Sequence, residues 1–120
     1  MSLPTADELL RKTCAPCEGG IPPLTAAEAE TLLGRVEGWA LSPEGDRIRR
    51  AWTARNYQAA IDFFVKVAAL ADQEGHHPDL HLEGYRRVTI ELWTHAISGL
   101  SENDFILAAK INQVPISLKR

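Results

Sequence analysis

The segment from about Asn56 to Gln73 constrains the fold of this chain more than any other, because it carries the strongest helical repeat. Two apolar rows step along it by three and four residues: Tyr57, Ile61, Phe64, Ala68 and Ala71, and beside them Ala60, Phe63, Val67 and Leu70. With Val65, the rows span roughly 220° of a helical wheel, about twice the stripe that a helix needs to pack on one sheet. We therefore expect the additional face to contact another copy of the chain; the alternative is a helix that is buried deeply within its own small domain.

Shorter elements are predicted on both sides of this helix. Thr25-Ala26-Ala27-Glu28 has the capping-box pattern that begins a helix, which should end near Gly38. Two hairpins are predicted from runs of β-forming residues bounded by turn residues, with strands at about 39–41, 48–53, 80–83 and 86–94. A last helix should begin after a cap at Ser101, with Asp104 at the capping-box carboxylate position, and end at about Gln113.

Alternation in the second hairpin indicates how the sheet packs. Its apolar residues, Leu80, Leu82, Val88, Ile90 and Leu92, alternate with polar ones. This pattern is typical of an antiparallel sheet with one face on the core. The element order α-β-β-α-β-β-α predicts an α+β fold, in which helices pack on one face of a four-stranded antiparallel sheet.

Length and charge limit the classes of function. A chain of 120 residues is long enough for one domain with its own core, but has few elements to cover the wide helix face. The net charge of −3 argues against a nucleic-acid binder, despite the cluster of Arg47, Arg49 and Arg50. No apolar run approaches the ~20 residues of a membrane span, and the N-terminus lacks a signal-peptide pattern, so we expect a cytoplasmic protein.

The two cysteines, Cys14 and Cys17, form a single C-x-x-C pair. No second pair follows to complete a four-ligand zinc site. The Gly- and Pro-rich residues after it are typical of a loop, whereas a thioredoxin-like pair leads into a helix. We expect a reduced pair in an ordered N-terminal arm, residues 1–23, followed by a single domain over residues 24–120.

Histidines provide the candidate chemistry. His76 and His77 lie between the long helix and the third strand, and His95 follows the fourth strand. Because the third and fourth strands pair as a hairpin, these three imidazoles should converge. Pro78 keeps His77 extended, and Asp72, one helical turn before His76, is placed to orient the His76 ring. Convergent imidazoles with carboxylates suit proton transfer near neutral pH.

Two other interpretations of the histidines remain. A metal site is possible, with His76, His77, His95 and Asp79 as ligands, although neither H-x3-H on a helix nor H-E-x-x-H is present. Surface histidines near a helix C-terminus are a second alternative. Strand alternation puts His81 on the polar face of the sheet, so we expect it to be an ordinary surface residue.

These residues carry a resemblance to a known family. The elements Asp72, His76-His77-Pro78, Tyr85, Thr94-His95 and Gly99-Leu100-Ser101-Glu102-Asn103-Asp104 resemble the signature of the pterin-4a-carbinolamine dehydratases. The similarity covers about Leu24 to Val114. The family fold, an α-β-β-α-β-β-α domain assembling into dimers or tetramers, agrees with the element order predicted above.

The resemblance implies a hydro-lyase reaction. Its substrate would be the carbinolamine, 4a-hydroxytetrahydrobiopterin, that aromatic amino acid hydroxylases produce, and its product quinonoid dihydropterin, which is recycled to tetrahydrobiopterin. The reaction needs neither a metal nor a redox cofactor. By motif, His76, His77 and His95 would be the acid/base set, with His77 favoured as the acid, and Asp72 and Asp104 would orient them. Trp39 matches an aromatic position that is placed either against the pterin or in the core.

The family also suggests functions of other classes. Animal members serve as a dimerisation cofactor of a transcription factor, so a non-catalytic regulatory partner is an alternative. A task in molybdopterin metabolism is another. The intact histidine set favours the enzyme, because a binding module has no need of it.

Overall fold

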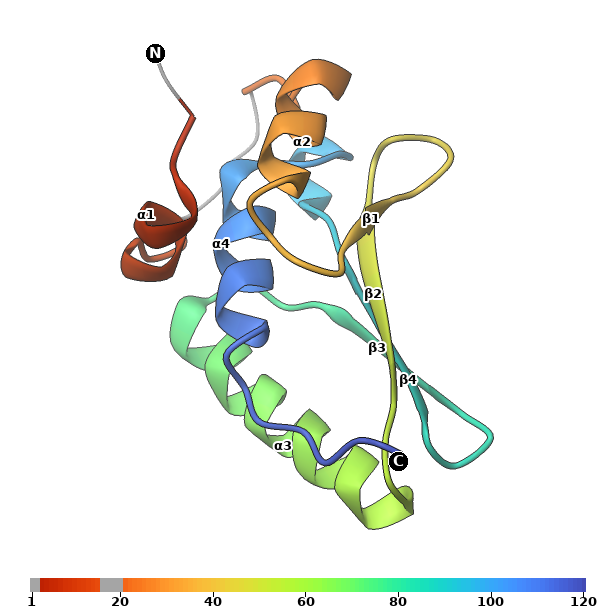
Figure 1. The fold of residues 1–120 in the computed structure, drawn as a ribbon. Helices are drawn as coiled ribbons and strands as arrows, with labels where there is room; N and C mark the ends of the chain where they lie inside the picture. Colours follow the sequence, from red (N-terminus) through yellow and green to blue (C-terminus); the bar gives the residue numbers. More distant parts are fainter. Residues whose placement is uncertain (1–2, 16–20) are drawn as a thin grey trace.

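Four antiparallel strands form the framework on which the helices pack (Figure 1). The computed structural model describes residues 3–15 and 21–120. Its strands are β1 (Ala40–Leu41), β2 (Ile48–Thr53), β3 (Asp79–Glu83) and β4 (Arg87–Leu92), in the spatial order β1-β2-β4-β3. Both predicted hairpins are present, and the α+β fold class is confirmed.

Helices cover one face of this sheet (Figure 1). They are α2 (Ala26–Leu33), α3 (Tyr57–Glu74) and α4 (Glu102–Ile111), and a short 3-10 helix, η1 (His95–Ile97), follows β4. The caps expected at Thr25 and Ser101 are in place: the Glu28 carboxylate accepts the Thr25 N–H at 2.9 Å, and the Asp104 carboxylate accepts the Ser101 N–H at 3.0 Å. None of the helices in the described ranges is long and apolar enough to cross a membrane.

A further helix, α1 (Ala6–Arg11), lies in the N-terminal arm and packs against α4. This helix was not predicted from the sequence, although Thr5 and Glu8 repeat the capping-box spacing of α2. The Thr5 hydroxyl accepts the Glu8 N–H, and the Glu8 carboxylate accepts the Thr5 N–H. Leu9 is fully buried in the core. A single buried residue is too weak a periodic signal to reveal a six-residue helix.

Alternation along β4 directs its apolar side chains into the core, as predicted. Val88, Ile90 and Leu92 are fully buried, and Leu82 of β3 packs against them. The prediction is wrong for Leu80, which is 38% exposed. The reason is its position on β3, an edge strand of the sheet.

Only part of the wide apolar face of α3 is covered by the chain itself. Ala60, Phe63, Val67 and Ala71 are buried against the sheet and α4. Beside them, Ile61 and Phe64 are half-buried, while Tyr57 and Val65 are 56% and 63% exposed. A row of apolar side chains on α3 therefore faces solvent in the isolated chain.

Candidate active site

Three histidines meet at one cavity of about 350 Å³, as the hairpin argument predicted. Its lining residues are Ala15, Gly75, His76, His77, Thr94, His95, Ala96 and Asn103. The register of the hairpin explains the convergence: Asp79 of β3 pairs with Glu91 of β4, so the residues before β3 lie beside those after β4. The volume is within the range of about 300–1,000 Å³ that is usual for small-molecule sites.

The end of α3 determines where the two adjacent histidines point. Gly75 adopts a left-handed conformation, with φ 66° and ψ 24°, and its N–H bonds to carbonyls of the last turn. Such a residue ends a helix and reverses the chain. His76 is therefore no longer on the helix face of Asp72. Pro78, half-buried, then leads into β3.

Asp72 accordingly orients a different ring from the one predicted. Its Oδ1 lies 3.0 Å from His77 Nε2, whereas His76 turns toward α4. The expectation that Asp72 orients His76 is wrong, because it assumed that helical spacing continues through Gly75. The Asp72–His77 pair is open to solvent, with 78% and 65% of the two side chains exposed.

Asp104 is the carboxylate that orients His76. It is fully buried, and its Oδ1 lies 2.6 Å from His76 Nε2. Its Oδ2 accepts the Ser101 N–H at 3.0 Å and the Thr94 hydroxyl at 2.8 Å. Since the Thr94 proton is used in that bond, the Ser101 hydroxyl donates to Thr94 Oγ1 at 2.7 Å. An ionised Asp104 then leaves His76 Nε2 to carry a proton, and its Nδ1 holds the lone pair of the neutral ring.

The N-terminal arm forms a wall of the same cavity. Asn103 pairs with the backbone of Ala15 in both directions, accepting its N–H at 2.9 Å and donating to its carbonyl at 2.6 Å. The Cys14 N–H donates to Glu74 Oε1 at 2.9 Å, and Lys110 donates to the other oxygen of Glu74 at 2.8 Å. No sequence motif assigned a function to this arm, and only the fold places it beside the histidines.

Two pKa shifts accompany this docking. Burial, reinforced by the neighbouring Glu74 carboxylate, raises the pKa of the half-buried Cys14 thiol to about 12. Burial also opposes ionisation of Glu74, but the hydrogen bonds from Lys110 and Cys14 outweigh it and hold the Glu74 pKa below its ordinary value. The other half of the C-x-x-C pair, Cys17, lies outside the described residues.

Trp39 lies apart from this cavity, in the core. It is 6% exposed, its indole N–H donates to Asn112 Oδ1 at 2.9 Å, and its ring packs edge-to-face on Trp52. Of the two placements expected for Trp39, the structure shows the core one. The ordinary role expected for His81 also fits, since it pairs with Glu91 at 2.9 Å on the polar side of the sheet.

The histidine cavity does not present a ready set of metal ligands. Within residues 3–15 and 21–120, no group of three or more His, Cys, Asp or Glu side chains is arranged to hold a metal ion. Asp104 and Asp72 each engage a ring nitrogen of a histidine. Asp79, the fourth ligand considered, accepts the Trp93 indole N–H at 3.2 Å.

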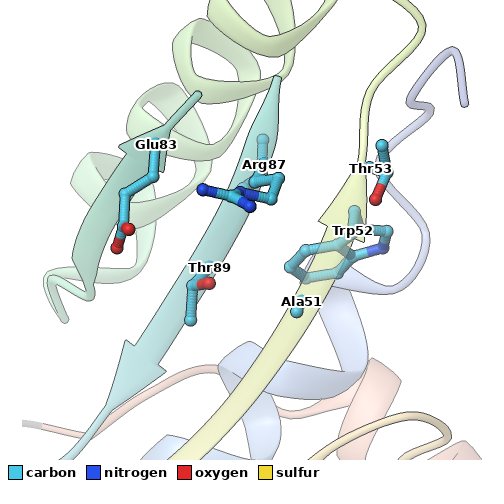
Figure 2. A pocket seen from close by; sticks show the side chains of 7 residues that line it. Ala51, Trp52, Thr53, Glu83, Arg87 and Thr89 are labelled. Carbon is cyan, nitrogen blue, oxygen red and sulfur yellow. The ribbon is translucent and has the colours of Figure 1, made fainter. Parts of the chain in front are cut away.

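A second cavity, of about 260 Å³, lies on the outer face of the sheet (Figure 2). Its titratable side chains are Glu83 and Arg87, which face it together with Ala51, Thr53 and Thr89. It contains no imidazole or other group that commonly exchanges protons near neutral pH. The histidine cavity is therefore the better candidate for an active site.

Comparison with known proteins supports that choice. The family model described as pterin 4 alpha carbinolamine dehydratase matches residues 22–114. The chain belongs to this family. The match includes all three converging histidines and both carboxylates that bond to them, and it confirms the resemblance seen in the sequence.

Relatives of known name and structure agree with this membership. The chain is 47% identical over 112 residues to the Arabidopsis thaliana protein pterin-4-alpha-carbinolamine dehydratase 2, mitochondrial, covering 91% of this chain and 60% of that longer protein. A Methylococcus capsulatus relative is 47% identical over 109 residues, which cover 91% and 95% of the two chains.

The solved structures share the fold. A transcriptional coactivator/pterin dehydratase from Brucella melitensis superposes with a TM-score of 0.71 at 29% identity, covering 77% of this chain and 97% of the other. A pterin dehydratase-like RuBisCO assembly factor of the alpha-carboxysome superposes with a TM-score of 0.55 at 20% identity, over 65% and 89% of the two chains. The second likeness concerns the fold alone.

Proposed function

We propose that this protein removes water from 4a-hydroxytetrahydrobiopterin to give quinonoid dihydropterin, as a step in tetrahydrobiopterin recycling. One observation carries the proposal: three imidazoles, two of them held by carboxylates, line one cavity in a member of the dehydratase family. A function that only required binding would not need this arrangement.

The reaction requires two proton transfers. The C4a–O bond breaks as the hydroxyl accepts a proton and leaves as water. The neighbouring ring nitrogen loses its proton, and its electron pair forms the new C=N bond. One imidazolium and one neutral imidazole can perform both transfers, and together they return to their starting protonation after a single exchange with water.

We assign the acid to His77 and the ring-nitrogen proton to His76 and His95. The exposed Asp72–His77 pair is in contact with solvent, so His77 can regain its proton from water after each turnover. His76 is 12% exposed and its Nε2–H is directed to buried Asp104, which fixes the tautomer whose Nδ1 carries the lone pair and can accept a proton. Removal of the substrate proton is the role that suits a base of this kind.

The decisive experiment is a direct assay of carbinolamine dehydration, with and without a chelator. We expect turnover that the chelator does not change. His77→Ala should fold normally and lose most of its activity. The matched control is His81→Ala, because His81 also pairs with a carboxylate but lies outside the cavity. Full turnover by His77→Ala would contradict its assignment, and a wild-type protein without turnover would contradict the function.

Assembly and location form a second part of the proposal. The exposed apolar row of α3, with Tyr57 and Val65, supports a homodimer or homotetramer built through this helix or through sheet edges. Sedimentation equilibrium tests this oligomeric state, and a monomer at micromolar concentration would contradict it.

We further propose that residues 1–23 act as an arm of one domain over 24–120, and that the protein acts in the cytoplasm.

A regulatory role is the second candidate function. It is favoured by the Brucella melitensis neighbour, which is described as a transcriptional coactivator/pterin dehydratase, and by the uncovered face of α3. The two functions differ in their sensitivity to substitution at the histidines. A binding role would survive His77→Ala unchanged, whereas dehydration would not.

A further inference from the structure

The third histidine of the cavity is oriented differently from the other two. Within residues 3–15 and 21–120, carboxylates bond to the rings of His76 and His77, but no hydrogen bond reaches the ring of His95. Instead, the His95 imidazole is stacked on the indole of Trp93, with 3.9 Å between ring centroids and 27° between ring planes. His95 is otherwise an exposed residue at the start of η1.

Trp93 is itself fixed by contacts from other segments. Its indole N–H donates to Asp79 Oδ2 at 3.2 Å, and the Arg47 guanidinium lies 4.4 Å from its ring centroid. Arg47 is in turn held between two carboxylates, 3.7 Å from Asp79 and 3.9 Å from Glu91. The indole is thus held by β3 and by the residue that precedes β2, so its plane is well defined.

From this geometry we propose that Trp93 is a positioning residue for His95. A flat ring against the imidazole restricts its rotation while leaving both nitrogens free at the ring edge, where a substrate proton would be exchanged. The indole therefore fixes the orientation of the His95 ring, as Asp104 and Asp72 fix the orientations of the His76 and His77 rings. The inference rests on the proposed function, in which His95 takes part in removing the ring-nitrogen proton.

The Asp79 contact adds a connection between the two halves of the site. Asp79 follows His77 and Pro78 directly, and Trp93 precedes His95 by two residues. Their hydrogen bond links the segment that carries His77 to the segment that carries His95. Arg47 contributes by holding the indole and Asp79 together, so it acts on His95 only through Trp93.

Paired substitutions at Trp93 test the proposal. Trp93→Phe keeps a flat ring and loses the bond to Asp79, whereas Trp93→Leu removes the ring. An aromatic stack is worth about 0.5–1.5 kcal/mol, which corresponds to roughly 2- to 12-fold in rate. We expect Trp93→Leu to lower kcat roughly three- to tenfold with KM nearly unchanged, and Trp93→Phe to recover most of that loss.

An NMR measurement reports the stack independently of activity. The indole should shift the His95 ring protons upfield relative to those of His81, and Trp93→Leu should abolish the shift. Trp52→Phe is the matched control, because Trp52 also carries an arginine, Arg50, 4.8 Å from its ring centroid, but lies outside the histidine cavity. It should leave kcat and the His95 shifts unchanged.

Three results would overturn the proposal: wild-type kcat in Trp93→Leu, equal losses in the Phe and Leu variants, or no upfield shift in the wild-type protein. If Trp93→Leu does not fold, Arg47→Gln is the variant to measure. Loss of this half-exposed side chain should loosen the indole and lower kcat about twofold. Unchanged kcat and unchanged His95 ring shifts would contradict the role of Trp93 in positioning His95. Absence of turnover in the wild-type protein is a separate outcome, which refutes the proposed function itself.

Discussion

Replacing Asp104 by Asn should invert the proton arrangement of His76 without removing a hydrogen-bonding group. Two donors, the Ser101 N–H and the Thr94 hydroxyl, both point at Oδ2 of Asp104. The amide oxygen of Asn must therefore occupy that position, and its NH2 group then faces His76 Nε2, 2.6 Å away in the native protein. His76 can no longer donate from Nε2, so its proton moves to Nδ1.

The magnitude follows from what the substitution leaves in place. Catalysis by a correctly protonated imidazole contributes on the order of 10²–10⁴ in rate, so kcat should fall by about that factor. Stability should change much less, because each hydrogen bond is retained but loses its charge assistance. We expect a loss of about 1–2 kcal/mol, or a Tm lower by roughly 4–8 °C for a chain of this size.

The assay compares carbinolamine dehydration at 25 °C in the two proteins, with thermal unfolding to confirm the fold and ¹⁵N NMR to identify the protonated nitrogen of His76. Glu28→Gln is the matched control: it makes the same change in the capping-box carboxylate of α2, which accepts the Thr25 N–H but touches no histidine. It should leave kcat unchanged. A folded Asp104→Asn protein with kcat within threefold of wild type would refute the role given to Asp104.

Two further predictions concern the docked arm. Because hydrogen bonds hold the pKa of Glu74 lower in the folded than in the unfolded protein, its stabilising contribution is present above the unfolded pKa of about 4.5 and is lost as pH falls through the folded value. Urea unfolding should therefore show less acid destabilisation in Glu74→Gln than in wild type, and parallel curves would contradict this. With its pKa raised to about 12, Cys14 should be alkylated by iodoacetamide at pH 8 at least about tenfold more slowly in the folded than in the urea-unfolded protein, as peptide mass spectrometry can measure. Equal rates would indicate that the arm does not dock.

Local patterns were sufficient for most of the architecture. The spacing of Ala60, Phe63 and Val67 indicated α3, the capping box at Thr25 indicated α2, and alternation along β4 indicated the buried face of the sheet. These signals succeed because helical and strand periodicities are properties of adjacent residues. Leu80 shows the limit of this pattern. Its place in the alternation is regular, but alternation does not say whether another element covers the residue, and the edge position of β3 leaves Leu80 exposed.

The sequence by itself determined the main helices and strands of residues 24–120, their order and the meeting of His76 and His77 with His95, because periodicity and hairpin register follow from local pattern. Only the tertiary structure decided which group orients each ring. Gly75 reverses the chain, so that Asp72 pairs with His77 and not with His76. The packing of α4 places Asp104, 28 residues away in the sequence, against His76. The indole beneath His95 and the arm beside Asn103 likewise depend on contacts between separate elements. Such contacts are fixed by how whole elements pack, which no periodicity within one segment encodes.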